Sequence, residues 1–237
     1  MMRDSPPDVN ARIARSVRLH GVRYTFRAAL RHVNASISRL LDRHFDIAFG
    51  SDTRGVMEND SLTDVVSPNL GRGIRYEPTR ALPLRRVLRA AHLPTDGGFV
   101  DLGCGKGRAL MVAALCGFPQ VTGVEYSRAL CAIAERNLDL LRTRTKRKFT
   151  SSVIARDAAD YAFTAHDTVV YLFNPFDAVV LAAVLAHLGR SLERHPRTVW
   201  IVYHNPVRRD VIDRDGGFAL AGEYAAGGEG FAVYRSR

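Results

Sequence analysis

The sequence contains little cysteine and no long apolar run, and each shortage excludes a class of protein. Its three cysteines, Cys104, Cys116 and Cys131, are odd in number and lack the Cys-x-x-Cys spacing of zinc sites. We therefore expect reduced thiols, with neither disulfide bonds nor a metal site. No apolar stretch approaches the roughly 20 residues that span a bilayer, and the first residues contain no apolar segment of a signal peptide. These observations predict a cytoplasmic protein without a membrane segment.

Basic charge is abundant by contrast, although only three of the 34 basic residues are lysines. The formal net charge is +10. Basic residues concentrate in the N-terminal part of the chain and in the run Arg142-Thr-Arg-Thr-Lys-Arg-Lys148. This charge fits an acidic partner such as nucleic acid. A solvated face is the simpler interpretation, because no aromatic side chains interleave with the run as they do in a platform that stacks single strands.

The length of 237 residues allows one α/β domain with an additional region. We expect residues 1–79 to form that region. Apolar residues recur at spacings of three and four from Ala11 to about Phe49, which predicts helix. The polar, turn-rich residues 50–78 then form an entrance loop or lid before a helix from Ala81 to His92. Residues 80–237 form the second domain.

The most informative stretch is a glycine-rich turn between an apolar segment and a helix-forming run. It reads Phe99-Val-Asp-Leu-Gly-Cys-Gly-Lys-Gly-Arg-Ala-Leu110. The order of strand, tight turn and helix is typical of the point where a doubly wound α/β sheet binds a nucleotide-like ligand. Gly103, Gly105 and Gly107 lack Cβ, which allows positive φ angles and a close approach of a ligand to the backbone.

The spacing of this turn separates it from two common phosphate-binding loops. A dinucleotide-binding loop, G-x-G-x-x-G, requires its last glycine where Arg108 stands. A P-loop requires glycine at Val100 and serine or threonine at Gly107. Asp101 on the strand side also disfavours a pyrophosphate, because a carboxylate repels it.

Three later segments read as buried strands that end in polar residues. They are Gln120–Tyr126, Ser152–Asp157 and Thr168–Phe176. A carboxylate in the position of Glu125 can accept both hydroxyls of a ribose. Asp157 also suits a helix N-cap, and Asn174-Pro175 also suits a simple strand end, as Asn205-Pro206 does one strand later.

The alternation continues through the rest of the chain and predicts the fold class. Helices are expected near residues 106–116, 127–141 and 177–194, and a fifth strand near Thr198. Two final strands, Phe218–Tyr224 and Gly230–Arg235, are joined by a hairpin signal. The sequence thus predicts an α/β fold with a doubly wound sheet, a terminal antiparallel hairpin and an N-terminal helical extension.

The turn Asp101-Leu-Gly-Cys-Gly-Lys-Gly107, followed by these strand ends in order, resembles the first motif and layout of class I S-adenosylmethionine-dependent methyltransferases. The resemblance covers about residues 46–210 and implies a Rossmann-like, seven-stranded, mostly parallel sheet with S-adenosyl-L-methionine as cofactor. Asp101 suits its ammonium group and Asp157 its adenine amino group. Thr79 either caps the following helix or binds the methionine carboxylate. The implied cofactor contacts are Tyr76, Thr79, Asp101, Gly103, Gly105, Gly107, Glu125, Tyr126, Asp157, Ala158 and Asn174.

The end of the fourth strand, Asn174-Pro175-Phe176, resembles the Asn-Pro-Pro-Tyr type motif of amino-group N-methyltransferases, with one proline and with Phe for Tyr. The resemblance implies that Asn174, Pro175 and Phe176 are the catalytic residues: carbonyl oxygens of the turn orient the target amine, and Phe176 packs against a planar acceptor. Together with Tyr-x-Pro-Thr before the core, the layout is similar to a group of largely uncharacterised bacterial methyltransferases, and more distantly to non-SET histone-lysine methyltransferases.

The expected function is therefore N-methylation of an amino group on a protein, a nucleic acid or a small molecule. Two other classes remain open. One is a non-catalytic basic module that binds nucleic acid on a methyltransferase scaffold. The other is an NAD(P)-dependent Rossmann oxidoreductase, which the glycine spacing and Asp101 disfavour.

Overall fold

The computed structural model describes residues 17–18, 21–22, 40–41, 43–55, 64–66 and 77–237. Tyr76, most of the expected N-terminal helix and much of the expected entrance loop lie outside these residues. Within them, residues 43–49 are helical, as predicted. Gly21 is not helical and has a φ of +83°, so the helix expected from Ala11 to Phe49 is not continuous. Glycine adopts this left-handed conformation without the steric penalty of a Cβ.

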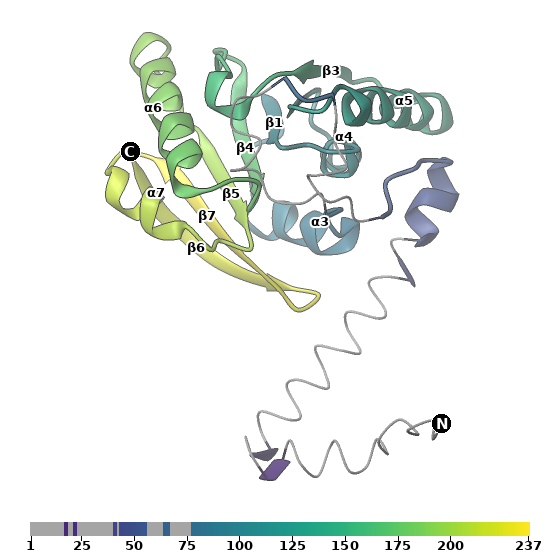
Figure 1. The fold of residues 1–237 in the computed structure, drawn as a ribbon, viewed down its shortest axis with the longest axis horizontal. Helices are drawn as coiled ribbons and strands as arrows, with labels where there is room; N and C mark the ends of the chain where they lie inside the picture. Colours follow the sequence, from purple (N-terminus) through teal and green to yellow (C-terminus); the bar gives the residue numbers. More distant parts are fainter. Residues whose placement is uncertain (1–16, 19–20, 23–39, 42, 56–63, 67–76) are drawn as a thin grey trace, which may run out of the picture.

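The centre of the molecule is a seven-stranded sheet with helices on both faces (Figure 1). The strand order is β3-β2-β1-β4-β5-β7-β6, in which β1 to β5 pair in parallel and β7 pairs antiparallel with β5 and β6. This confirms the predicted doubly wound, mostly parallel sheet with its terminal hairpin. The strands are β1 (Gly98–Leu102), β2 (Gln120–Glu125), β3 (Thr150–Ala155), β4 (Asp167–Phe173), β5 (Trp200–His204), β6 (Phe218–Ala226) and β7 (Glu229–Ser236).

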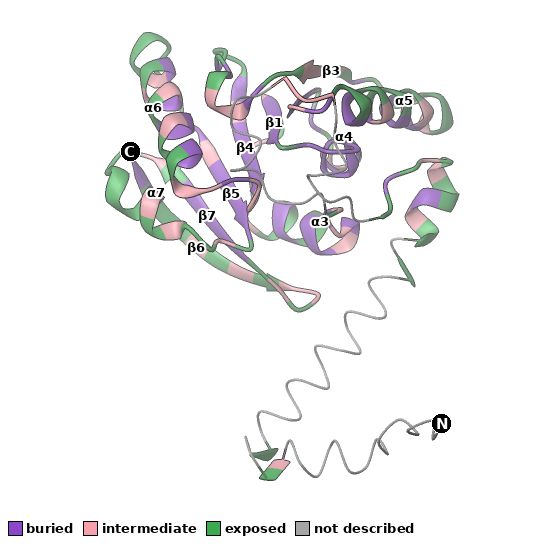
Figure 2. Cartoon of the chain, in the orientation of Figure 1, coloured by how far each residue is buried: buried purple, intermediate pink, exposed green. Residues whose placement is uncertain are grey.

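Each face of the sheet has its own layer of helices because both faces of the central strands are apolar. Successive residues of β1 illustrate this: Phe99 packs with α3, α4 and α5, whereas Val100 packs with α6 and α7. Figure 2 shows the resulting band of buried residues through the central strands. The helices are α3 (Ala81–Ala90), α4 (Arg108–Cys116), α5 (Arg128–Thr145), α6 (Ala178–Arg194) and α7 (Arg209–Asp215), with a short 3₁₀ turn, η3 (Ala158–Asp160).

Local signals fix where the helices around the site begin. The Ser127 hydroxyl accepts a hydrogen bond from the Leu130 N–H at the start of α5. Asp177 caps α6 by accepting from Val179 and Val180. These side chains satisfy N–H groups that the helix itself cannot pair. Within the part of the chain that the structure describes, none of the helices has the length and apolar character to cross a membrane.

The packing of α6 yields a matched test of the fold. Val184 is 1% exposed in the core, whereas Val179 on the same helix is 60% exposed. We expect Val184→Ala to lower the free energy of unfolding by about 1.5–3 kcal/mol, the value of a buried valine side chain. Val179→Ala is the control, and it should be neutral or slightly stabilising because alanine favours helix. Urea unfolding measures both, and equal effects of the two variants would contradict this packing.

Candidate cofactor and acceptor site

A cleft opens at the carboxyl ends of the parallel strands, where β1 and β4 lie side by side and the strand order changes direction. This switch point is where doubly wound sheets bind their ligands. Seven of the predicted site residues line the cleft: Thr79, Asp101, Gly103, Glu125, Tyr126, Asn174 and Pro175. Sequence reasoning missed seven further lining residues: Glu77, Cys104, Arg108, Ala109, Leu130, Phe173 and Asn205.

Asp101, at the end of β1, is a buried carboxyl group that faces this cleft. Burial raises its pKa well above the usual range, and the nearby charge of Glu125 raises it further. No group among the described residues donates a hydrogen bond to it. Because burying a carboxylate is costly, a ligand with a cationic group is its natural complement.

Glu125, at the end of β2, connects the glycine turn to the start of α5. Its Oε2 accepts a hydrogen bond from the Gly105 N–H at 2.9 Å, and its Oε1 accepts one from the Ser127 N–H at 3.1 Å. Burial raises the pKa of Glu125, and these hydrogen bonds partly offset the increase. Each carboxylate oxygen can accept more than one hydrogen bond, so Glu125 retains capacity for hydroxyl groups of a ligand.

The glycine turn packs directly against the Asn174-Pro175 turn that follows β4. Gly103 has a φ of +80°, and a Cβ at this position would lie 2.7 Å from Cβ of Pro175. A side chain there would therefore collide with the Asn174-Pro175 turn. The close approach places the expected cofactor turn beside the expected acceptor turn.

Both Asn-Pro pairs end their strands in the same unusual conformation. Asn174 and Asn205 have φ angles of +42° and +49°, in the left-handed region that asparagine tolerates better than most residues. Both line the cleft. The Tyr203 hydroxyl donates to Oδ1 of Asn174 at 3.3 Å, which restrains that side chain. Asn205 is therefore a cleft residue and not a simple strand end, and the repeated Asn-Pro pair is the signal in the sequence that points to it.

Thr79 does not cap α3, contrary to one of the two expectations. The N-cap residue is Arg80, and its side chain makes no capping hydrogen bond. The Thr79 hydroxyl instead pairs with the Tyr171 hydroxyl at 2.9 Å, and the Tyr171 hydroxyl also pairs with Nδ1 of His204 at 2.9 Å. His204 is buried and stacks between Phe173 and Phe231. Thr79 is thereby fixed to the ends of β4 and β5.

Other predicted site residues lie beside the cleft rather than in its described lining. Gly105 and Gly107 belong to the glycine turn. Asp157 is the N-cap of η3, where Oδ1 accepts from the Ala159 N–H at 2.8 Å, and Ala158 is the first residue of η3. The adenine contact of this segment stays a prediction. Phe176 is 6% exposed and packs in the core with α6, outside the described lining of the cleft, so its expected contact with a planar acceptor stays a prediction.

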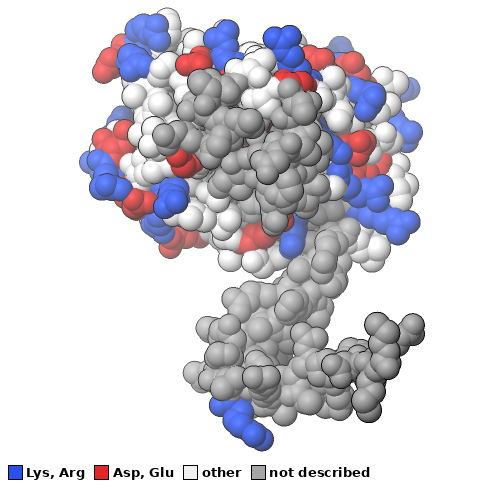
Figure 3. All heavy atoms as spheres, in the orientation of Figure 1, with Lys and Arg blue, Asp and Glu red and all other residues white. Residues whose placement is uncertain are grey.

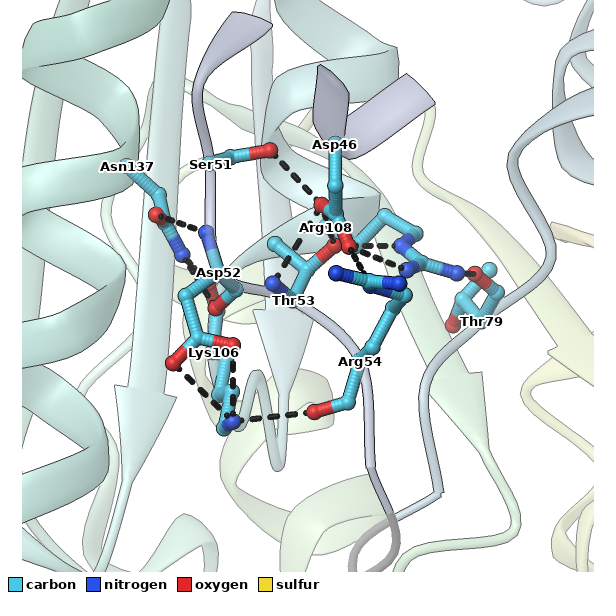
Figure 4. Close-up of polar contacts among 9 residues, drawn as sticks. All are labelled: Asp46, Ser51, Asp52, Thr53, Arg54, Thr79, Lys106, Arg108 and Asn137. Atoms are coloured by element: carbon cyan, nitrogen blue, oxygen red, sulfur yellow. Dashed lines mark hydrogen bonds and ion pairs between the residues drawn. The ribbon is translucent and has the colours of Figure 1, made fainter. Parts of the chain in front are cut away.

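The described parts of residues 50–79 contact the glycine turn, the start of α5 and strand β4. Residues 51–54 lie against the glycine turn, as Figure 4 shows. The Val66 N–H donates to the Tyr126 carbonyl at 3.0 Å, and Asp64 accepts hydrogen bonds from the first turn of α5. Thr79 itself lines the cleft and pairs with Tyr171 of β4. These contacts agree with a role as an entrance loop, which remains a proposal.

Comparison with known proteins identifies the same region of the chain. A family model described as "Methyltransferase domain" matches residues 100–200, which include the glycine turn, Glu125 and Asn174. A search of curated proteins gives no match.

Solved structures show the same fold at low sequence identity. An Escherichia coli protein assigned as methyltransferase yhhF is 18% identical with a TM-score of 0.52, covering 77% of this chain and 99% of that one. A Streptococcus agalactiae protein of the NADB-Rossmann superfamily is 15% identical with a TM-score of 0.51, covering 68% and 69%. An RNA methyltransferase from Salinibacter ruber, in complex with S-adenosyl-L-homocysteine, is 22% identical with a TM-score of 0.48, covering 68% and 92%. The first two likenesses show the fold and leave the acceptor open.

The two buried carboxylates predict a defined loss of cofactor affinity. Asp101→Ala and Glu125→Ala should each weaken S-adenosylmethionine binding by about 1–3 kcal/mol, because each removes a charged hydrogen-bond partner. Isothermal titration calorimetry measures the change. Val179→Ala, at an exposed position of α6 outside the lining of the cleft, is the control. Unchanged affinity in both carboxylate variants would rule out this site.

The raised pKa of Asp101 also predicts a pH dependence. Only the ionised carboxyl offsets the charge of a cofactor ammonium group, so affinity should fall as the pH is lowered through the raised pKa of Asp101. Below that pKa, binding should release a proton. Calorimetry in two buffers with different ionisation enthalpies counts this proton. Asp101→Asn should abolish the part of the dependence due to Asp101, and an affinity independent of pH in the wild type would contradict the assignment.

Proposed function

We propose that this chain is a class I S-adenosylmethionine-dependent methyltransferase that methylates an amino nitrogen, because a methyltransferase-domain model matches residues 100–200 and the cleft at the strand ends suits that cofactor. The acceptor classes that fit are a protein, a nucleic acid or a small molecule. The observation that carries the proposal is the position of Asn174, which lies in the cleft while its neighbour Pro175 touches the glycine turn. A group held at Asn174 therefore lies next to the cofactor site.

Asp101 and Glu125 are suited to bind different parts of the cofactor. When bound, S-adenosylmethionine supplies an electrophilic methyl group on a sulfonium. Asp101 is suited to hold its ammonium group, and Glu125 to accept hydrogen bonds from its ribose hydroxyls. Their negative charge suits a cationic ligand and opposes a pyrophosphate, which argues against the nicotinamide alternative.

Asn174 is suited to orient the amine rather than to ionise it. Its side-chain oxygen accepts one hydrogen bond from Tyr203 and has a second lone pair for an N–H of the acceptor. A carbonyl that accepts the N–H directs the nitrogen lone pair toward the methyl group, and alignment is the main requirement of such a displacement. The proton of the methylated amine can then pass to solvent at the cleft mouth.

The basic surface of the protein lies apart from this cleft. Arg85, Arg89 and Arg147 are exposed and lie close enough to Cys116 to lower its pKa, although burial has the larger, opposite effect. Figure 3 shows Lys and Arg side chains on the side of the molecule where α5 lies and also around the rest of this face, interspersed with acidic side chains. This surface is available to an acidic partner, including nucleic acid. The cleft itself is acidic, apart from Arg108, and so favours the catalytic proposal over a purely binding one.

The amine-orienting role predicts a separation of catalysis from cofactor binding. Asn174→Ala should lower kcat by about 10²-fold or more, as loss of one preorganised polar contact does, and leave cofactor affinity nearly unchanged. The assay transfers a labelled methyl group to a fractionated lysate and follows label into protein, nucleic acid or small molecules. Asn205→Ala is the matched comparison, since it removes a similar side chain from the neighbouring strand end.

A normal rate of the Asn174→Ala enzyme with its true acceptor would contradict the amine-orienting role. Methylation of oxygen, sulfur or carbon would then replace it. Label in a fraction that contains no amino groups would contradict it as well.

A further inference from the structure

The two cations of the glycine turn are buried against the N-terminal region. Lys106 is 8% exposed and Arg108 is 2% exposed, which long cationic side chains rarely are unless they are paired. Both point toward residues 46–54, which precede the turn by about 50 positions (Figure 4). We call residues 46–54 the clamp segment.

Arg108 contacts the clamp segment through a buried ion pair. Its Nη2 lies 3.2 Å from Oδ2 of Asp46, and its Nε donates to the Thr53 hydroxyl at 2.6 Å. Asp46 is 3% exposed and also accepts hydrogen bonds from Ser51 and Thr53. Arg108 further donates to the Thr79 carbonyl at 3.4 Å. One guanidinium thus joins the glycine turn, the clamp segment and the cleft wall.

Lys106 makes the second connection between the glycine turn and the clamp segment, and Asn137 of α5 contacts both of them. Its Nζ lies 3.2 Å from Oδ1 of Asp52 and donates to the Arg54 carbonyl at 2.9 Å. The buried amide of Asn137 donates to the carbonyls of both Asp52 and Lys106 and accepts from the Asp52 N–H, each at 2.9 Å. The side chain of Asn137 therefore hydrogen-bonds to the backbone of both the clamp segment and the glycine turn.

These contacts matter because the turn has little rigidity of its own. Gly103, Gly105 and Gly107 have φ angles of +80°, +52° and +82°. Glycines lose more conformational freedom on ordering than other residues, so a turn with three of them needs external restraints. Glu125 restrains its inner side through Gly105. The clamp segment restrains the outer side.

We propose that Asp46 and Asp52 are positioning residues for the cofactor, which act through Arg108 and Lys106. They hold the glycine turn in the shape that receives S-adenosylmethionine, so the clamp segment is a part of the cofactor site. The proposal rests on the methyltransferase activity and does not depend on which acceptor is methylated. The proposal implies that cofactor affinity decreases when the ion pairs between the clamp segment and the glycine turn are broken.

A charge exchange tests this pairing in the full-length protein. We expect Asp52→Lys and Lys106→Glu each to raise the Kd of S-adenosylhomocysteine by about fivefold or more, because each places like charges together. The double variant restores an opposite pair and should return the Kd to within about threefold of the wild-type value. Asp52→Asn, at a side chain that is 58% exposed, should raise the Kd about twofold and cannot disrupt the core.

The control is Asp139→Lys, which breaks an exposed ion pair with Arg142 elsewhere on α5 and should leave the Kd unchanged. Thermal unfolding of every variant separates stability from affinity. Variants that unfold at lower temperature but keep the wild-type Kd would make the clamp segment a structural element only and overturn the proposal. So would a double variant that binds no better than the single ones. A wild-type protein that does not bind S-adenosylhomocysteine would contradict the cofactor assignment itself.

Discussion

The site depends on one carboxylate that holds the glycine turn in place. Glu125 accepts hydrogen bonds from the turn at Gly105 and from the start of α5 at Ser127, and it is buried where it does so. These bonds fix the turn relative to β2, and the close contact of Gly103 with Pro175 fixes it relative to β4. The cofactor turn and the acceptor turn are therefore positioned by the same few contacts, and the cleft between them follows from this arrangement.

The electrostatic character of the cleft follows from the same carboxylates. Asp101 and Glu125 are both buried, and each has a raised pKa because burial disfavours its charged form. A cationic ligand offsets this cost, whereas a pyrophosphate increases it. Arg108, the cation in the described lining, is paired with Asp46. The acidic cleft and the basic exterior thus have separate physical origins, and the net charge of the chain says little about the ligand.

Much of the fold could be predicted from the sequence because its signals are local. Apolar runs and the glycine spacing mark the strands and helices, and strand ends locate Asp101, Glu125 and Asn174. The contacts of Asp46 and Asp52 could not be predicted, since they join residues separated by more than fifty positions and no periodicity reports such a pairing. The positions of Thr79 and Phe176 also depend on packing. Tyr171 binds the Thr79 hydroxyl, and the core receives Phe176.

The most direct test of the central claim, that this acidic cleft binds S-adenosylmethionine, is a pair of calorimetric titrations of the wild-type protein. One uses S-adenosylmethionine and the other NADH, at the same pH and ionic strength. The buried Asp101 and Glu125 complement the ammonium and ribose groups of the first ligand and repel the pyrophosphate of the second. Saturable binding of S-adenosylmethionine at one site per chain, with no binding of NADH, is the predicted result. Saturable binding of NADH without binding of S-adenosylmethionine would contradict it.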